Sequence, residues 1–499
     1  MAEVKFVDTT LRDGNQSLWG AIGMSNEVVL PIAPTIARAR YRTVDFTNSM
    51  MMSIAARIHR EDPWERLRLV KAAIPNAPLG LITGPNRFIT WNVTPPALMK
   101  LGLSLLVRNG IGCFYILDPM NNMDETEAAA AIVKQAGEAR TVIALTYSIS
   151  PLHTDEHFVK CAERVKNSKV IDALYFKDPG GLATPERIAA LFPKLHKALE
   201  GGRVKLEEIH THCNTGLAPL NHLEAIKQGV RIIHTAVGPL ANGTSHPSAA
   251  SMIRNVRALG HDVDLDEAAI EEASRYFRRI ALRDGLPLGK PVEYDASYYT
   301  HQIPGGMYST MRRQLTEVGL QDRFEETLRE VPLVRKELGY PIMVTPFSQF
   351  VGAQALMNVI SGKRYSMVPD EIIHYLLGSF GKVTGPVDPD VQSRILESRR
   401  AREIAALPPV ADGEETIRSL RKKLGSNVSD EELMLRATMK EEDVDGMRRG
   451  HAIENGISVA QPLADAIRAF AQRKHLSSIS IGWKKTHISV SRAQVARPG

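Results

Sequence analysis

The chain has 499 residues, 43% of them hydrophobic and 24% charged, and its net charge is +6. This length exceeds what a single hydrophobic core supports, so we expect two or three domains, while the scattered basic residues argue against nucleic-acid binding. The three cysteines are dispersed along the chain, which argues against disulfides. No apolar run approaches the roughly 20 residues of a membrane span, and the N-terminus lacks a signal-peptide pattern. We therefore expect a cytoplasmic protein with neither disulfides nor membrane segments.

Short apolar runs alternate with helix-like segments through the first half of the chain. The runs that predict strands are 4–8, 42–47, 79–83, 113–118, 141–147, 172–177, 207–212 and 232–237. Helical spacing lies between them, for example at 26–40, 64–73 and 185–199. This alternation implies parallel β-α-β units of an α/β fold, and eight units fit a closed (β/α)8 TIM barrel. A doubly wound sheet is the alternative, but the first strand is not followed by the glycine-rich phosphate turn typical of that fold.

Beyond about residue 250 the pattern becomes helical. Helices are expected at 267–283, 321–338, 349–359, 370–377 and 390–407. Proline and glycine then predict a linker near 408–414. We therefore predict four units: a barrel over 1–250, a mostly helical domain over 251–407, a small helical segment over 415–476, and a basic flexible tail over 477–499.

Reactive side chains lie at the C-terminal ends of three of the predicted strands, either on the strand or just after it. They are Arg12, Asp13 and Gln16 after the first strand, Lys177 on the sixth, and His210 and His212 on the seventh. In an α/β barrel the loops at these strand ends carry the chemistry. Two histidines at alternate positions of a strand project to the same side, so both can reach one ion, and Asp13 adds a carboxylate. Such a set suits Zn, Mn, Co or a similar divalent metal.

Each of these residues also has an ordinary structural interpretation. The two histidines fit a hydrogen-bonded polar pair, and Lys177 fits an ion pair with a barrel carboxylate that compensates its buried charge. Asp13 fits the cap of the following helix. The three features coincide at the strand ends of one barrel, and this coincidence favours the metal site.

Several segments, in the same order along the chain, resemble one enzyme family. They include residues 8–17 (DTTLRDGNQS), 176–181 (FKDPGG), 210–216 (HTHCNTG), 302–308 (QIPGGMY) and 344–353 (VTPFSQFVGA). These motifs are similar to those of the carboxyltransferase component of biotin-dependent 2-oxoacid carboxylases, the family of pyruvate carboxylase, oxaloacetate decarboxylase and transcarboxylase.

The resemblance implies a TIM barrel followed by a mostly helical domain that forms a funnel over the barrel mouth. The metal ligands that it implies are Asp13, Lys177, His210 and His212. Lys177 would be a carbamate, which turns its cation into an anionic oxygen ligand. Gln16 would contact the substrate, and Ser309, at the position of a family threonine, would move a proton between biotin and substrate. In this mechanism the substrate enolate attacks CO2 released from carboxybiotin, and the metal and Arg12 stabilise the enolate charge.

The substrate pocket departs from the family pattern, although the implied metal ligands are all present. Thr83 stands where the family has an arginine that binds the pyruvate carboxylate, and Asn48 lies in a segment that replaces the family's WGGAT. Loss of the arginine removes a bidentate carboxylate partner, so we expect a substrate other than pyruvate. Arg87, further along the same loop, is the candidate replacement. The predicted substrate-binding residues are Gln16, Asn48, Thr83 and Arg87.

Residues 437–440 (ATMK) resemble a biotin-attachment motif only faintly. We therefore expect biotin on a separate carrier protein, a separate biotin carboxylase subunit, a homo-oligomeric assembly and a small-molecule substrate. Two other functions stay open: a biotin-independent metal-dependent lyase, aldolase or decarboxylase on the same barrel, and a catalytically weakened scaffold subunit. Only the carboxyl-transfer reaction requires the hydroxyl group of Ser309 for proton transfer.

Overall fold

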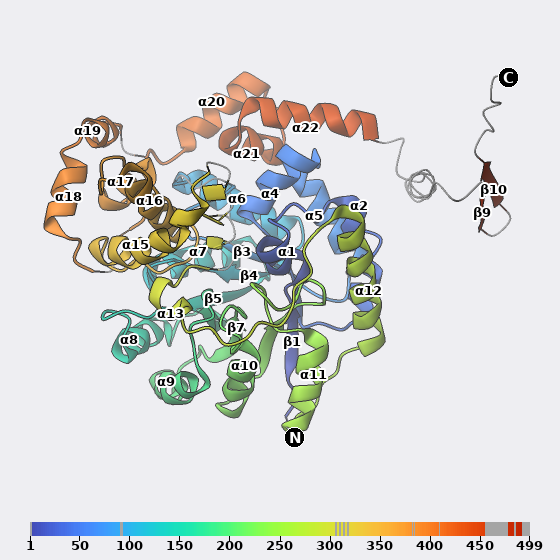
Figure 1. The fold of residues 1–499 in the computed structure, drawn as a ribbon. Helices are drawn as coiled ribbons and strands as arrows, with labels where there is room; N and C mark the ends of the chain where they lie inside the picture. Colours follow the sequence, from blue (N-terminus) through green and yellow to red (C-terminus); the bar gives the residue numbers. More distant parts are fainter. Residues whose placement is uncertain are drawn as a thin grey trace, which may run out of the picture.

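The structure, a computed structural model, describes residues 2–454 apart from 90–92, 305–306, 309–310, 313–314, 317–318, 382, 384 and 409, together with 478–483 and 486–491. At its centre lies a closed barrel of parallel strands paired in sequence order, so the predicted TIM barrel is confirmed (Figure 1). The strands are β1 (Lys5–Asp8), β2 (Thr43–Asn48), β3 (Leu79–Thr83), β4 (Ile111–Ile116), β5 (Arg140–Thr146), β6 (Ala173–Asp178), β7 (Leu206–Thr211) and β8 (Ile232–Thr235).

Helices surround this barrel, and several of them begin at a polar residue that caps the first turn. The side chains of Asp62, Asn122, Thr154 and Thr184 accept hydrogen bonds from backbone N–H groups at the starts of α5, α7, α8 and α9, which satisfies donors that a helix start leaves unpaired. The longer surrounding helices are α5 (Pro63–Ala73), α6 (Pro96–Arg108), α7 (Met123–Ala136), α8 (Asp155–Val165), α9 (Pro185–Ala198), α10 (Ala218–Lys227), α11 (Ala249–Ala258) and α12 (Glu267–Asp284).

Two segments that the sequence predicts as single helices are each divided in the structure. The predicted helix 26–40 consists of α2 (Asn26–Val29) and α3 (Ala33–Arg38), because Pro31 between them has no N–H to continue the helix. The predicted helix 390–407 consists of α18 (Pro389–Leu396) and α19 (Arg399–Ala405). There, the Ser398 side chain accepts a hydrogen bond from the Ala401 N–H and starts a new helix instead.

A helical unit follows the barrel, as predicted, and has its own hydrophobic core. Its main helices are α13 (Tyr298–His301), α15 (Phe324–Glu337), α16 (Phe347–Ser361), α17 (Asp370–Leu376), α18 and α19. Hydrogen bonds join it to the loop after β5: Arg335 donates to the Ser148 hydroxyl and the Ile149 carbonyl, at 2.9 and 3.0 Å, and Gln302 donates to the same carbonyl at 2.9 Å. These contacts hold the helical unit at the C-terminal ends of the strands.

The helical unit also contributes to the interior of the barrel. Ile342 and Val344, just before α16, are buried in one cluster with side chains from β1, β4 and β6, including Val7, Tyr115 and Tyr175. Burial of these two side chains removes apolar surface from water on both units. The interior of the barrel is therefore completed by residues from outside it.

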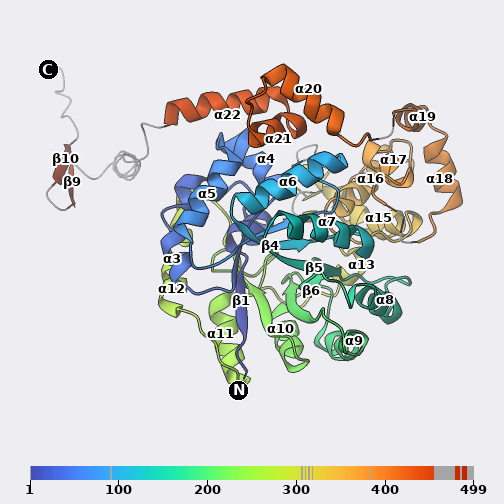
Figure 2. The ribbon, with the colours of Figure 1, turned by 180° about the vertical axis from the view of Figure 1, so that it is seen from behind.

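Three further helices lie across the barrel helices α5 and α6, on the side of the molecule away from the N-terminus (Figures 1 and 2). They are α20 (Glu414–Leu424), α21 (Asp430–Thr438) and α22 (Glu441–Glu454). The Trp64 indole N–H donates to the Glu431 carbonyl at 3.2 Å, and Arg448 pairs with Asp62 at 2.5 Å. Apolar residues of α21 and α22 belong to the same core cluster as the barrel helices.

Within the predicted flexible tail, β9 (Ser478–Trp483) and β10 (Thr486–Ser491) pair as antiparallel strands. These strands are not among the elements expected from the sequence. Flexibility of the segment stays a prediction, as does the division of the chain at residues 250, 407 and 476. Among the residues that the structure describes, no helix is both long and apolar enough to cross a bilayer.

Candidate metal centre and active site

The first turn after β1 places three predicted site residues at the mouth of the barrel. Residues Thr10–Gly14 form a short π-helical turn whose residues are all buried, a conformation that is frequent at functional sites. The turn directs the Asp13 carboxylate towards Lys177 and His210, each the last residue but one of its strand, β6 and β7. Strand β6 is buried along its whole length, so Lys177 carries its amine into a confined interior.

Four nitrogen atoms converge on one oxygen of Asp13. Nε2 of His210, His246 and His212 lie 3.1, 3.2 and 3.6 Å from Asp13 Oδ2, and Lys177 Nζ lies 4.0 Å from it. Ligand atoms from Asp13 and the three histidines all lie within 4.8 Å of one another. We call Asp13, His210, His212 and His246 the Asp-His cluster. A carboxylate oxygen with imidazole nitrogens is a donor set that fits Zn, Mn or Co.

The imidazole rings are oriented by hydrogen bonds on their outer sides. Nδ1 of His212 lies 2.8 Å from the Thr244 carbonyl, and Nδ1 of His210 lies 3.0 Å from Nδ1 of His234. His234 in turn lies 2.9 Å from the carboxylate of Glu208 through Nε2. Such outer partners set the tautomer of a metal-binding histidine and leave the inner nitrogen free to bind.

Burial and charge set the protonation of the cluster. Burial alone raises the pKa of the Asp13 carboxyl, but the Arg12 charge and the imidazoles of His212 and His210 outweigh it and hold that pKa well below its ordinary value. Burial lowers the pKa of Lys177 to about 8, and burial with the nearby Lys177 charge lowers the pKa of His210 well below its usual range. Asp13 is therefore a carboxylate and His210 a neutral imidazole, which are the forms that bind metals.

Arg12 is shared between two buried carboxylates. Its Nε and Nη2 donate to Asp45 Oδ2 at 2.8 and 2.5 Å, and its Nη1 lies 2.7 Å from Asp13 Oδ2. Asp45 lies on β2 and is fully buried. The predicted role of Arg12 towards an enolate stays a prediction; the contacts shown are those that orient Asp13.

The predicted substrate-binding residues fall into two groups. Asn48 donates to the side-chain oxygen Oε1 of Gln16 at 2.8 Å, and its own Oδ1 caps α4 (Ser49–Ile54). Thr83 is buried and donates to the Gly84 carbonyl at 3.1 Å. Arg87 instead donates to the Asn86 side-chain oxygen at 2.7 Å and to the Ser379 carbonyl at 3.0 Å. Its guanidinium carbon lies 4.1 Å from the centroid of the Phe380 ring, so Arg87 joins the barrel loop to the helical unit. Their roles in substrate binding stay predictions.

Ser309, the predicted proton-transfer residue, lies outside the described residues. Sequence reasoning missed His246, which joins the cluster from the loop after β8, and also His234 and Asp45, which orient its members. The signal for His246 is its place after the last barrel strand, at the same end of the barrel as the other reactive residues.

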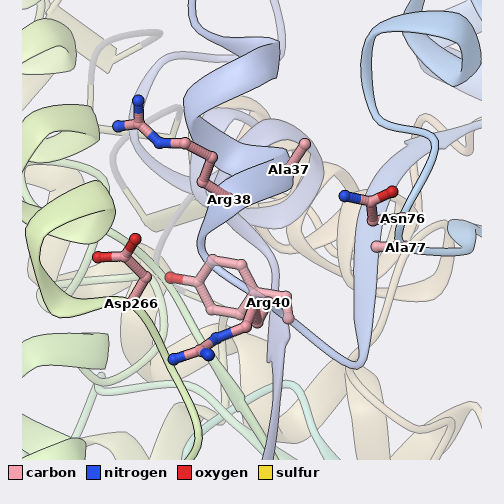
Figure 3. Close-up of a pocket in the computed structure, with 7 residues that line it drawn as sticks. Ala37, Arg38, Arg40, Asn76, Ala77 and Asp266 are labelled. Carbon is pink, nitrogen blue, oxygen red and sulfur yellow. The ribbon is translucent and has the colours of Figure 1, made fainter.

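Two surface cavities lie outside the cluster. One of about 430 Å³ is bounded by Arg38, Arg40, Asn76 and Asp266, at the N-terminal ends of the strands (Figure 3), whereas catalysis in such barrels takes place at the opposite end. Another of about 330 Å³ lies at the mouth, where Tyr147 of the barrel faces Tyr299 of the helical unit.

Comparison with known proteins identifies two matching family models. One, described as "Conserved carboxylase domain", matches residues 298–456, and the other, described as "HMGL-like", matches residues 117–276. Together these matches fall on the barrel and the helical unit.

The chain is also similar to curated proteins over most of its length. It is 34% identical over 413 residues to a pyruvate carboxylase subunit of Methanocaldococcus jannaschii, covering 81% of this chain and 71% of the relative. It is 30% identical over 440 residues to the 2-oxoglutarate carboxylase large subunit of Hydrogenobacter thermophilus, covering 87% and 67%. The fold matches the carboxyl transferase domain of Rhizobium etli pyruvate carboxylase with a TM-score of 0.80 and 24% identity, covering 90% of this chain and 77% of that one.

Proposed function

The chain belongs to the carboxyltransferase family of biotin-dependent carboxylases, and from this premise we propose that it transfers a carboxyl group between carboxybiotin and the enolate of a small acid or carbonyl compound other than pyruvate. The proposal includes a divalent metal, Zn, Mn or Co, held at Asp13, His210, His212 and a carbamate on Lys177. The observation that supports it is the convergence of these side chains at the mouth of the barrel.

The surroundings of these residues suit the formation of an enolate. Asp13, Lys177 and His210 are each at most 5% exposed, and this low exposure keeps water away and strengthens electrostatic interactions. A bound metal supplies a Lewis acid that polarises a substrate oxygen. Arg12 adds a fixed positive charge next to Asp13, and the Gln16–Asn48 pair offers amide groups to the substrate.

Ser309 completes the proposal as the group that moves a proton between substrate and biotin. A hydroxyl can do so because it both donates and accepts hydrogen bonds. We expect Ser309→Ala to lower carboxyl transfer by about 100-fold, in the range typical of one acid–base group, whereas the control Ser309→Thr, which keeps the hydroxyl, retains most activity.

The proposed exclusion of pyruvate is based on Thr83. Its hydroxyl is already used within its own loop, and threonine cannot bind a carboxylate through two parallel N–H donors as arginine does. The names of the two relatives, a pyruvate carboxylase subunit and a 2-oxoglutarate carboxylase subunit, indicate that substrates differ within the family.

We further propose that biotin arrives on a separate carrier protein, that a separate biotin carboxylase subunit charges it, and that the chain forms a homo-oligomer. The relative from Methanocaldococcus jannaschii is named as one subunit of its enzyme, which supports a division of the reaction among several chains.

The function is tested by offering the metal-loaded protein carboxybiotin with a radiolabelled carboxyl group, on a carrier protein, and a panel of 2-oxoacids and acyl thioesters. We expect the labelled carboxyl group to be transferred to at least one acceptor, and transfer to pyruvate to be slower than to that acceptor. If pyruvate is the fastest acceptor, the substrate assignment is wrong. If no acceptor is labelled although metal is bound, the scaffold alternative gains support. If a substrate is cleaved equally fast without biotin, the result supports the lyase alternative.

The carbamate is tested separately. We expect protein equilibrated with isotope-labelled bicarbonate to show a carbamate signal by carbon NMR, because the buried amine lies next to groups that a carbamate oxygen would join around a metal. Lys177→Met should remove the signal. Lys160→Met, which changes an exposed lysine paired with Glu156, should leave it. An unchanged spectrum in Lys177→Met would rule the carbamate out.

A further inference from the structure

We propose that His246 is a metal ligand, so that the Asp-His cluster retains its ion whether or not Lys177 carries a carbamate. This inference rests on the proposed function for the presence of a metal but assigns a ligand and a mode of retention that the family resemblance does not imply. The position of His246, its tautomer and the arrangement of the neighbouring side chains support this assignment.

The position of His246 matches that of the two predicted histidine ligands. Its ring centroid lies 4.1 Å from that of His210 and 4.3 Å from that of His212. Its Nε2 lies 3.2 Å from Asp13 Oδ2, compared with 3.1 Å for His210 and 3.6 Å for His212. His246 is fully buried, so its ring has no solvent partner.

The tautomer of His246 directs a lone pair at Asp13. Nδ1 lies 2.9 Å from the Thr211 carbonyl oxygen, and a carbonyl can only accept, so Nδ1 carries the proton. In the neutral ring Nε2 then has a lone pair, and it is a buried atom without a hydrogen-bond partner. A lone pair and a carboxylate oxygen 3.2 Å apart repel each other unless a cation lies between them. A shared metal ion satisfies both atoms.

The same arrangement recurs at the other two rings. His212 contacts the Thr244 carbonyl through Nδ1, and His210 contacts His234 through Nδ1. All three histidines therefore use the outer nitrogen for orientation and turn Nε2 towards Asp13, which is the usual pattern of outer-shell support in metal sites. A carboxylate with three imidazoles already supplies the four ligands that a tetrahedral site requires.

Lys177 differs from these three residues. Its amine lies 2.8 Å from His210 Nε2 and 4.0 Å from Asp13 Oδ2, farther from that oxygen than any of the three imidazole nitrogens. The Asp-His cluster supplies four ligand atoms without Lys177. A carbamate on Lys177 would then add an oxygen ligand to the ion that these four residues hold.

The experiment measures metal affinity, with Zn and Co titrated into the full chain in CO2-depleted buffer and in bicarbonate. We expect the wild type and Lys177→Met to bind one ion in both buffers. His246→Gln should weaken binding at least about 100-fold, since even outer-shell changes cost 10- to 100-fold. The matched control His222→Gln removes a buried histidine that is outside the cluster and should bind as the wild type does. Unchanged affinity in His246→Gln, or wild-type binding only with bicarbonate, would overturn the inference.

X-ray absorption of the zinc-loaded wild type gives a second measurement that needs no variant. A count of three imidazole ligands around the ion supports the inference, and a count of two refutes it. This measurement decides the question even if His246→Gln does not fold. These results are independent of carboxyl transfer. If the protein binds metal through three imidazoles but transfers no carboxyl group, only the proposed function is refuted. If the protein is active but its metal has two imidazole ligands, only the role of His246 is refuted.

Discussion

Replacing Asp13 with asparagine is expected to lower carboxyl transfer by about 10³-fold or more, because a Lewis-acid metal supplies several kcal/mol of transition-state stabilisation and about 4 kcal/mol corresponds to that factor in rate. Asp13 Oδ2 lies between 3.1 and 3.6 Å from three imidazole nitrogens, so it is the common point of the cluster. Asparagine keeps the shape of the side chain but loses the negative charge that attracts the ion. Metal content, measured by elemental analysis, should fall together with activity.

Asparagine is preferred to alanine for this test because its amide oxygen can still accept hydrogen bonds from Arg12 and Lys177, the two buried cations next to Asp13, whereas alanine would leave both without an acceptor there. Leaving buried charges without their partner costs about 3–5 kcal/mol, and an unfolded variant would say nothing about the metal. Asp118→Asn is the matched control: that carboxylate is also buried at the mouth but accepts hydrogen bonds from the backbone of Met120 and Asn122. Full metal content in Asp13→Asn would disprove the role of Asp13.

Arg12→Lys is expected to lower kcat by about 100- to 1,000-fold, the usual effect of removing one donor that stabilises a developing oxyanion. A lysine has one compact ammonium group and cannot bridge two carboxylates as the guanidinium does. The measurement that isolates this step is exchange of substrate protons with heavy water in the absence of carboxybiotin, since this exchange requires only enolate formation.

The contacts of Arg12 with Asp13 and Asp45 allow for an indirect effect, so metal content is measured in the same samples. If exchange is lost while metal is retained, Arg12 acts on the enolate; if both are lost, it is a positioning residue for Asp13. Exchange at the wild-type rate would contradict both roles. Arg66→Lys is the control, because Arg66 is an equally buried arginine whose partners are Glu61, Asn26 and Met24.

The sequence predicted the parts of this molecule that depend on local periodicity. Fully buried strands such as β6 read as apolar runs, and parallel strands place their C-terminal ends at one mouth. For this reason Asp13, Lys177 and His210, which belong to different strand ends, were expected together and are found together.

The parts that the sequence did not predict depend on loop paths and on side chains that meet across the barrel. His246 reaches the cluster through a loop after β8, whose course no periodicity encodes. Asp45 and His234 lie inside the barrel, where their pairing with Arg12 and His210 follows from strand register. The contacts of Arg87 with Ser379 and Phe380 also depend on how a barrel loop meets the helical unit, and its role in binding a substrate carboxylate stays a prediction.

Ile342 and Val344 of the helical unit are buried with Val7, Tyr115 and Tyr175 inside the barrel. Two segments that lie far apart in the chain thus complete the interior of the barrel. A chimera that joins this barrel to the helical unit of a relative changes the apolar packing inside the barrel even when every barrel residue is kept. Such a chimera therefore needs the segment before α16 to come from the same protein as the strands against which it packs.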